Sequence, residues 1–159
     1  MLSIATRSAF VFWIACLIRN KIGEDFLISI DANHAYNANT AIRVGKELEK
    51  YNIYWFEEPV IPEDINSYLE VKDSLTMAIA AGECEFTQYG FKELITRRAV
   101  DIAQADVSVS GGFTACKKIM SLARLYGVQV VPHIWGSAVA MYATLQFIAT
   151  IPDLPAANT

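Results

Sequence analysis

The chain has 159 residues, of which 53% are apolar and 19% are charged, so it can bury a substantial core and has the size of one globular domain. Its net charge of -4 offers no basic surface that could neutralise a phosphate backbone, which argues against nucleic acid as a partner. Its cysteines, Cys16, Cys84 and Cys116, form no C-x-x-C pair, which argues against a disulfide scaffold and predicts small buried side chains in a protein of the reducing cytoplasm.

Residues 1–21 are an atypical apolar segment at the start of the chain. Residues 9–18 read AFVFWIACLI, a run with some resemblance to the core of a signal peptide. The run is shorter than the roughly 20 residues that cross a bilayer, and Arg19, Asn20 and Lys21 follow it in place of a small-residue cleavage site. We therefore expect no membrane association, and we predict either a buried helix or a segment outside the fold.

Residues 22–159 are predicted to form one α/β domain from a unit that recurs five times. Each unit is a short apolar run that ends in a polar or ionisable residue and is followed by a helix-like segment. Because the runs lack polar alternation, they are typical of strands that are buried on both faces. The runs are residues 27–31, 53–57, 77–83, 101–106 and 128–133.

Helical patterns with recognisable ends follow these strands. The residues that precede or open the five predicted helices are Thr40, Pro62, Thr87, Gly112 and Ser137. Gly127 is expected to close the fourth helix. The fifth is expected to end by Thr150, ahead of Pro152.

Strands that alternate with helices imply parallel pairing through right-handed crossovers. The last residues of consecutive runs are about 25 positions apart, near the roughly 31 residues per unit of a 250-residue eightfold barrel. We therefore predict a partial TIM (β/α)8 barrel of about five units. All strands of such a barrel end at one face, and barrel active sites lie at that face.

The last residue of each predicted strand is ionisable, and we expect these residues to converge: Asp31, Glu57, Glu83, Asp106 and His133. Acids at strand ends can also simply cap the following helices, but their recurrence in consecutive units favours a shared site. Asp31, Glu57 and Glu83 are an all-oxygen ligand set that suits a hard cation such as Mg2+. Without a cation, these carboxylates would repel one another.

Asp106 and His133 end consecutive strands and are predicted to form a carboxylate–imidazole pair in which His133 acts as a base. A metal beside a base suits removal of the proton α to a carboxylate, because the cation stabilises the enediolate that forms. Hydrolysis by a metal-bound water is the competing use of such a site.

Five motifs together resemble the enolase superfamily, and within it the mandelate racemase and muconate lactonizing enzyme group, over about residues 22 to 155. The motifs are D-A-N at 31–33, W-F-E-E-P at 55–59, A-G-E at 81–83, Asp106 with G-G-F-T at 111–114, and P-H-I-W-G-S at 132–137. The resemblance implies that Asp31, Glu57 and Glu83 bind Mg2+. It also implies that Asp106 and His133 form a general acid/base dyad.

The resemblance further implies an enzyme that removes the proton α to the carboxylate of a sugar acid and then eliminates water, which is the reaction of a dehydratase, a lyase. Racemisation or lactone cycloisomerisation, the reactions of an isomerase, remain alternatives, as does a non-catalytic fragment. Asn33, His34 and Trp135 are the predicted substrate-binding residues. His34 and Trp135 could equally pack beside the site.

Members of this family also carry an N-terminal capping domain and a Lys-x-Lys motif on the second barrel strand, and the sequence contains neither. The five units correspond to strands three to seven of the barrel. A barrel of five units leaves unpaired strand edges. We therefore expect a truncated fragment of a longer enzyme that could be inactive alone or could associate as a homo-oligomer.

Overall fold

The computed structural model describes residues 4–152 and shows one five-stranded parallel sheet with the strand order β1-β2-β3-β4-β5. The elements in chain order are α1 (Ile4–Ile22), β1 (Ile28–Asp31), α2 (Ala38–Leu48), the 3-10 helix η1 (Glu49–Tyr51), β2 (Ile53–Glu57), α3 (Ile65–Ser74), β3 (Ala78–Ala81), α4 (Thr87–Thr96), β4 (Ile102–Ala103), α5 (Gly112–Tyr126), β5 (Gln129–Val130) and α6 (Ala138–Ile148). The predicted α/β partial barrel is confirmed.

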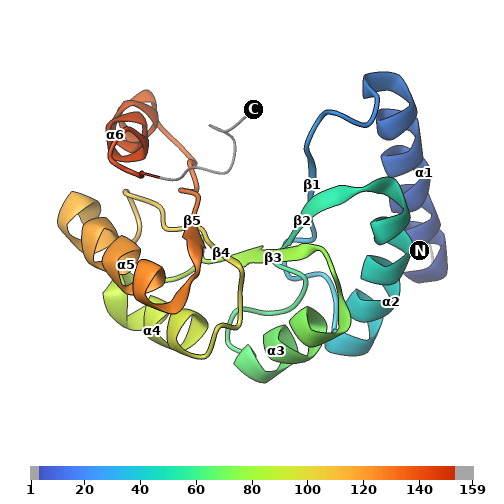
Figure 1. The fold of residues 1–159 in the computed structure, drawn as a ribbon, viewed down its shortest axis with the longest axis horizontal. Helices are drawn as coiled ribbons and strands as arrows, with labels where there is room; N and C mark the ends of the chain where they lie inside the picture. The colour runs from blue at the N-terminus through green and yellow to red at the C-terminus, as the bar shows by residue number, and fades with distance from the viewer. Residues whose placement is uncertain (1–3, 153–159) are drawn as a thin grey trace.

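The sheet curves into an arc with α2, α3, α4 and α5 along its outer side (Figure 1). The core lies between the strands and these helices, and Phe56, Ile79, Tyr68 and Phe91 are fully buried in it. Because every strand is parallel to its neighbours, all the strands end at the same rim of the arc.

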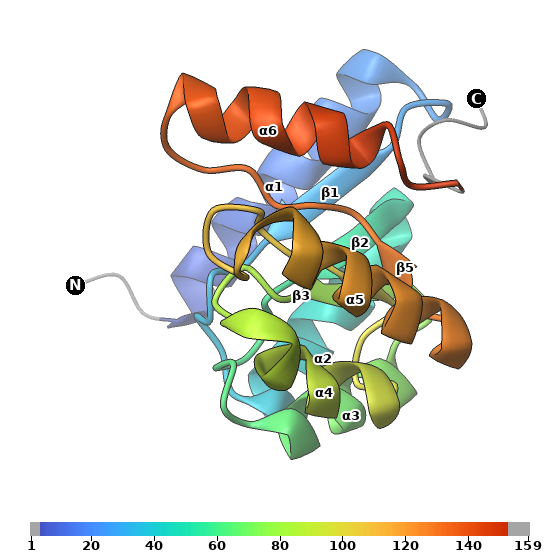
Figure 2. The ribbon, with the colours of Figure 1, turned by 90° about the vertical axis from the view of Figure 1, so that its left-hand side faces the viewer.

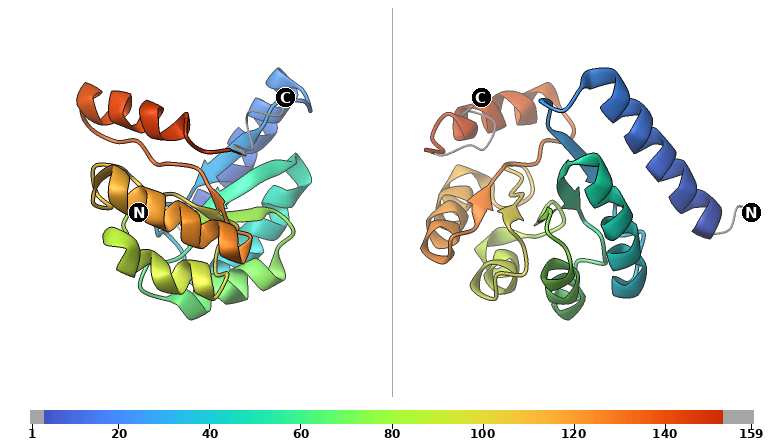
Figure 3. Two further views of the ribbon diagram at one scale, coloured as in Figure 1. Left: turned by 60° about the vertical axis from the view of Figure 1, so that its left-hand side comes forward. Right: turned by 45° about the vertical axis from the view of Figure 1, so that its right-hand side comes forward.

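The arc does not close, and among the described residues β1 and β5 each pair along one side only. Figure 3 shows the opening between the two ends of the arc, with α1 outside one end and α6 outside the other. Figure 2 shows α6 lying across the end of the arc, above α5. The expected self-association through these open edges stays a prediction.

Two predicted strands end where the sequence pattern placed them, and a third ends early. Asp31 and Glu57 are the last residues of β1 and β2, but β3 ends at Ala81 and leaves Glu83 on the following loop. The cause is Gly82, which has φ 136. A Cβ there would lie 2.6 Å from Phe91 Cε1, so only glycine allows the chain to turn away so close to α4.

The last two strands are also shorter than predicted. β4 and β5 end at Ala103 and Val130, so Asp106 and His133 lie on loops rather than at strand ends. Asp106 Oδ1 accepts a hydrogen bond of 2.6 Å from the Ser108 backbone N–H and so forms a turn. Pro132, which has no N–H group, cannot extend the ladder of β5.

Two helices begin at other residues than those predicted. The side chain of Asn37, not Thr40, caps α2 by accepting a hydrogen bond from Thr40 N, and Asp64, not Pro62, caps α3. Both are strong N-cap residues because a short side-chain oxygen reaches the free N–H groups of the first turn. The predicted ends at Ser137 and Gly127 are confirmed as the N-cap of α6 and the C-cap of α5.

Residues 4–22 form a regular helix, and neither prediction for the apolar segment is correct as stated. One side of α1 packs against α2 and η1 and buries Ala15 and Arg19, whereas Phe10 and Trp13 are each 59% exposed. The segment is therefore part of the fold, but it is not a buried helix. Across residues 4–152, no helix combines the length and the apolar character that crossing a bilayer would require. A domain boundary at residue 22 stays a prediction.

Arg19 attaches α1 to the rest of the fold. Its guanidinium donates hydrogen bonds to the backbone oxygens of Tyr51 (2.9 Å), Asn52 (2.7 Å), Gly23 (2.7 Å) and Phe26 (2.8 Å). The rigid fork of five N–H donors allows one side chain to hold four carbonyl groups. The helix is therefore fastened by polar contacts at its carboxyl end.

We expect Arg19→Ala to lower the free energy of unfolding by about 2–3 kcal/mol, because several hydrogen bonds to a charged donor are lost and partly buried carbonyls are left without a partner. Urea denaturation followed by circular dichroism measures the change. The control is Lys21→Ala, which removes an exposed cation from the same helix. Equal stability of the two variants would show that Arg19 does not fasten the helix.

Candidate active site

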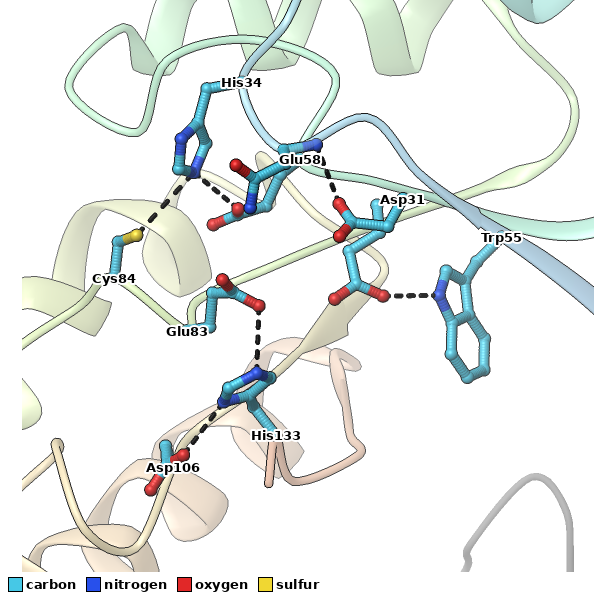
Figure 4. A network of polar contacts seen from close by, with 10 residues as sticks. Asp31, His34, Trp55, Glu58, Glu83, Cys84, Asp106 and His133 are labelled. Atoms are coloured by element: carbon cyan, nitrogen blue, oxygen red, sulfur yellow. Dashed lines mark hydrogen bonds and ion pairs between the residues drawn. The ribbon is translucent and has the colours of Figure 1, made fainter. Parts of the chain in front are cut away.

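Asp31 and Glu57 lie side by side on neighbouring strands. They are Cα partners in the parallel register of β1 and β2, and the Ala32 N–H donates to Glu57 O at 2.9 Å. Asp31 Oδ1 accepts a hydrogen bond of 2.8 Å from the Asn33 backbone N–H, and Glu57 Oε2 accepts one of 3.0 Å from Trp55 Nε1 (Figure 4). Each carboxylate therefore has one neutral donor and retains free lone pairs.

His133 lies between two acids that reach it from neighbouring loops (Figure 4). Its Nδ1 is 2.8 Å from Asp106 Oδ2, and its Nε2 is 3.2 Å from Glu83 Oε2. Asp106 and His133 each lie three residues beyond the register partners Ala103 and Val130, so the two loops leave the sheet at the same level. The carboxylate of Asp106, which is 2% exposed, fixes the imidazole through Nδ1 and leaves Nε2 to face the rim.

The three predicted metal ligands lie on one rim, but they are not gathered around one point. Among the described residues, the group whose potential ligand atoms all lie within 4.8 Å of one another is a different one, His34, Glu58 and Cys84. Asp31 and Glu57 accept hydrogen bonds from separate donors, and Glu83 Oε2 lies against His133 Nε2. Repulsion between like charges favours this separation. The assignment of the three acids as ligands stays a prediction.

The charge balance of the rim nevertheless fits a divalent cation. Burial, followed by the negative charges of Glu83, Asp31 and Glu57, raises the pKa of the Glu58 carboxyl to about 8. Within residues 4–152, the lysine and arginine side chains form their ion pairs with acids elsewhere, namely Glu24, Glu47, Glu93 and Asp101. Several carboxylates without a lysine or arginine partner form an oxygen-rich, negatively charged site of the kind that Mg2+ requires.

Glu58 was given no role by the sequence analysis. It is fully buried, its backbone has φ 39, and neither carboxylate oxygen has a hydrogen-bond partner. His34 Nε2 contacts Glu58 Oε2, but not in hydrogen-bond geometry. The signal in the sequence was the second acid of Glu57-Glu58-Pro59, since successive residues at a strand end point to opposite sides.

Cys84 is exposed, so the expectation that all three cysteines are buried was wrong. It directly follows Glu83, in a loop that turns back at Gly82, and its Sγ is 3.6 Å from His34 Nε2. Burial of the sulfur and the negative charges of Glu58 and Glu83 raise the pKa of the thiol to about 11. Cys116 is buried as predicted, and Cys16 is half-buried.

The three predicted substrate-binding residues occupy different surroundings. Asn33 is exposed beside Asp31, and the His34 ring is directed at Glu58 and Cys84 (Figure 4). Trp135 is 80% exposed and lines an open hollow with Ile134 and Met141. Their contact with substrate stays a prediction.

Two other hollows lie at the opposite end of the strands. One of them is lined by Tyr54, Lys72, Asp101 and Gln129, which are near the amino ends of β2, β4 and β5, and it contains the Lys72–Asp101 ion pair. Conserved chemistry in β/α barrels lies at the carboxyl ends of the strands, and the amino ends serve stability. The rim that carries the acids and His133 is therefore the candidate site.

Residues 15–158 match the model of the family described as Enolase C-terminal domain-like. Among curated proteins, the chain is 42% identical over 137 residues to the D-galactarolactone cycloisomerase of Agrobacterium fabrum, covering 86% of this chain and 36% of that protein. It is 34% identical over 134 residues to the arabinonate dehydratase of Saccharolobus solfataricus, covering 84% and 36%. The chain thus spans about a third of the length of these relatives.

Solved structures show the same fold. The 3,6-anhydro-D-galactonate cycloisomerase of Zobellia galactanivorans superposes with a TM-score of 0.88 at 42% identity, covering 91% of this chain and 41% of that one. A member of the enolase superfamily from Salmonella Typhimurium superposes with a TM-score of 0.90 at 25% identity, covering 96% and 39%.

Proposed function

Because the chain belongs to the enolase C-terminal domain-like family, we propose that its acidic rim binds Mg2+ and that His133 removes the proton α to the carboxylate of a sugar acid, after which water is eliminated. The observation that carries the proposal is the position of His133. Its Nδ1 is 2.8 Å from the buried Asp106 carboxylate, and its Nε2 is 3.2 Å from Glu83, one of the proposed metal ligands. A base held in this way faces the substrate that the metal would orient.

Each residue of the rim has a separate role in this proposal. Asp31, Glu57 and Glu83 would hold Mg2+, which when bound supplies positive charge to the substrate carboxylate as negative charge develops on it. Asp106 holds the proton on His133 Nδ1 and stabilises the imidazolium, while Nε2 accepts the α-proton. The imidazolium then returns a proton to the hydroxyl group that leaves the β-carbon, so that water departs and the base is regenerated.

Lactone cycloisomerisation is the second candidate reaction. The relatives reported above at 42% identity bear the names of cycloisomerases, whereas a relative at 34% identity is named as a dehydratase. Both reactions can begin at a carbon next to a carboxylate, so the same base and metal would serve either. We propose that residues 22–159 supply the metal-binding and base part of a longer barrel. The cytoplasmic location stays a prediction.

Product mass distinguishes the candidate reactions. We expect that a panel of sugar acids and their lactones, incubated with the protein and Mg2+ in deuterated water, yields a product that has lost one water molecule. The products are measured by mass spectrometry and the α-proton by NMR. A product that keeps all the atoms of the substrate, apart from deuterium taken up from the solvent, would favour cycloisomerisation or racemisation. A reaction that continues after chelation of the metal would contradict the metal-assisted mechanism.

A further inference from the structure

His34, Glu58 and Cys84 form a second cluster on the other side of the strand ends. The three residues follow the ends of β1, β2 and β3, respectively. The His34 backbone N–H donates a hydrogen bond of 2.9 Å to the Glu58 backbone oxygen, which holds these two residues side by side. Glu58 directly follows Glu57, and Cys84 directly follows Glu83. Figure 4 shows Glu83 directed at His133 while Cys84 is directed at His34. This cluster and the acidic rim are therefore built from the same loop segments, but adjacent residues point to opposite sides of the backbone.

The two side-chain oxygens of Glu58 lack hydrogen bonds. The residue is fully buried. The enclosed gap that Glu58 lines together with Tyr68, Cys84 and Leu94 has no room for a water molecule. Apart from the contact of Oε2 with His34 Nε2, which lies outside hydrogen-bond geometry, no polar group satisfies this buried carboxyl group. Burying such a group is costly, and a bound cation would compensate for it.

We propose that His34 Nε2, a Glu58 oxygen and Cys84 Sγ bind a borderline transition-metal ion of the Zn2+ class, at a site separate from the acidic rim. The three ligand atoms all lie within 4.8 Å of one another. The separation of 3.6 Å between His34 Nε2 and Cys84 Sγ is close to the roughly 3.5 Å that a tetrahedral zinc ion imposes on a nitrogen and a sulfur ligand.

The chemistry of the ligands selects the ion. Sulfur and imidazole nitrogen favour Zn2+ and Co2+, whereas Mg2+ favours oxygen ligands alone, so the two sites would take different metals. Three protein ligands leave a fourth position open for water or another small ligand. Cys84 is exposed and the His34 side chain is 26% exposed, which gives an ion access from solvent.

Co2+ titration tests the proposal, because a cobalt–thiolate bond gives an intense charge-transfer band in the near ultraviolet. We expect the intact chain to show this band at one equivalent of Co2+, and Zn2+ to abolish it while excess Mg2+ does not. Cys84→Ser should remove the band and weaken Zn2+ binding by roughly 100-fold or more, since loss even of a group that only supports a ligand costs 10–100-fold. Glu58→Gln should weaken Zn2+ binding with the thiol still present.

The matched control is Cys16→Ser, which removes a free cysteine on α1 and should leave the band unchanged. Glu83→Gln should also retain the band, which separates this site from the acidic rim. A band that persists in Cys84→Ser, that is lost in Cys16→Ser, or that never forms in the intact chain would overturn the proposal.

Discussion

His133→Asn should lower the exchange of the substrate α-proton with solvent by about 10²–10⁴-fold, the usual contribution of a positioned general base. In the original chain, Asp106 Oδ2 lies 2.8 Å from His133 Nδ1. The asparagine side chain can still donate a hydrogen bond to this carboxylate. It has no group that accepts a proton near neutral pH. The affinity for Mg2+ should stay within a few-fold of the original value, because the proposed metal ligands are untouched. NMR in deuterated water measures the exchange, and calorimetric titration measures the metal affinity.

Gln129→Ala provides the control for His133→Asn. Gln129 is an exposed residue of β5, the strand that precedes the loop of His133, and it lies at the end of the strand opposite to the rim. Its replacement should leave both exchange and metal affinity unchanged. Exchange at the original rate in His133→Asn would remove the histidine from its proposed role. A joint loss of exchange and metal binding would show instead that the imidazole supports the metal site.

Glu83→Gln should strongly weaken Mg2+ binding and abolish α-proton exchange. Glutamine has nearly the same shape, and its amide group can donate a hydrogen bond to His133 Nε2, which lies 3.2 Å from Glu83 Oε2. The variant therefore removes one negative charge and an anionic oxygen ligand while keeping the position of the base. We expect the affinity for Mg2+ to fall by roughly 100-fold or more, since Mg2+ binds through few carboxylates and loses one of them. Calorimetric titration with Mg2+ measures the change.

Glu93→Gln tests whether the effect comes from charge in general. Glu93 is an exposed acid on α4, on the helix that follows Glu83. Its neutralisation changes the net charge of the chain equally, but it should not change Mg2+ binding. Equal Mg2+ affinity in Glu83→Gln and in the original chain would contradict the assignment of Glu83 as a ligand. Retained Mg2+ binding with lost exchange would instead assign Glu83 to the positioning of His133.

The strands could be found from the sequence because burial on both faces leaves an unbroken apolar run that any chain of this fold must contain. Their ends were less predictable. Glu57 ends β2 as expected, whereas Glu83 lies beyond β3 because the backbone at Gly82 has φ 136 and turns away beside the Phe91 ring. The apolar pattern continues through residue 82, and it does not predict that Phe91 of α4 packs closely against this position.

The predicted pairing of Asp106 with His133 agrees with the distances, because consecutive parallel strands carry their following loops to the same level. The contact between His133 and Glu83 was not predicted. The sequence pattern predicts that both residues lie at the carboxyl ends of the strands, but it does not predict the direction of each side chain. For the same reason, the gathering of Asp31, Glu57 and Glu83 around one ion could not be settled by their spacing. Their side chains take whichever donors lie nearest, such as Trp55 Nε1 for Glu57.

The sequence by itself determined the repeated β/α unit and the rim on which the acids and His133 lie, because these follow from apolar periodicity and from parallel pairing between consecutive segments. Only the tertiary structure decided that His34 meets Cys84 across 50 positions and that Arg19 holds the carbonyl groups of Tyr51 and Asn52. Such contacts depend on where side chains point after the sheet has curved and the helices have packed. No local pattern of residues encodes that direction.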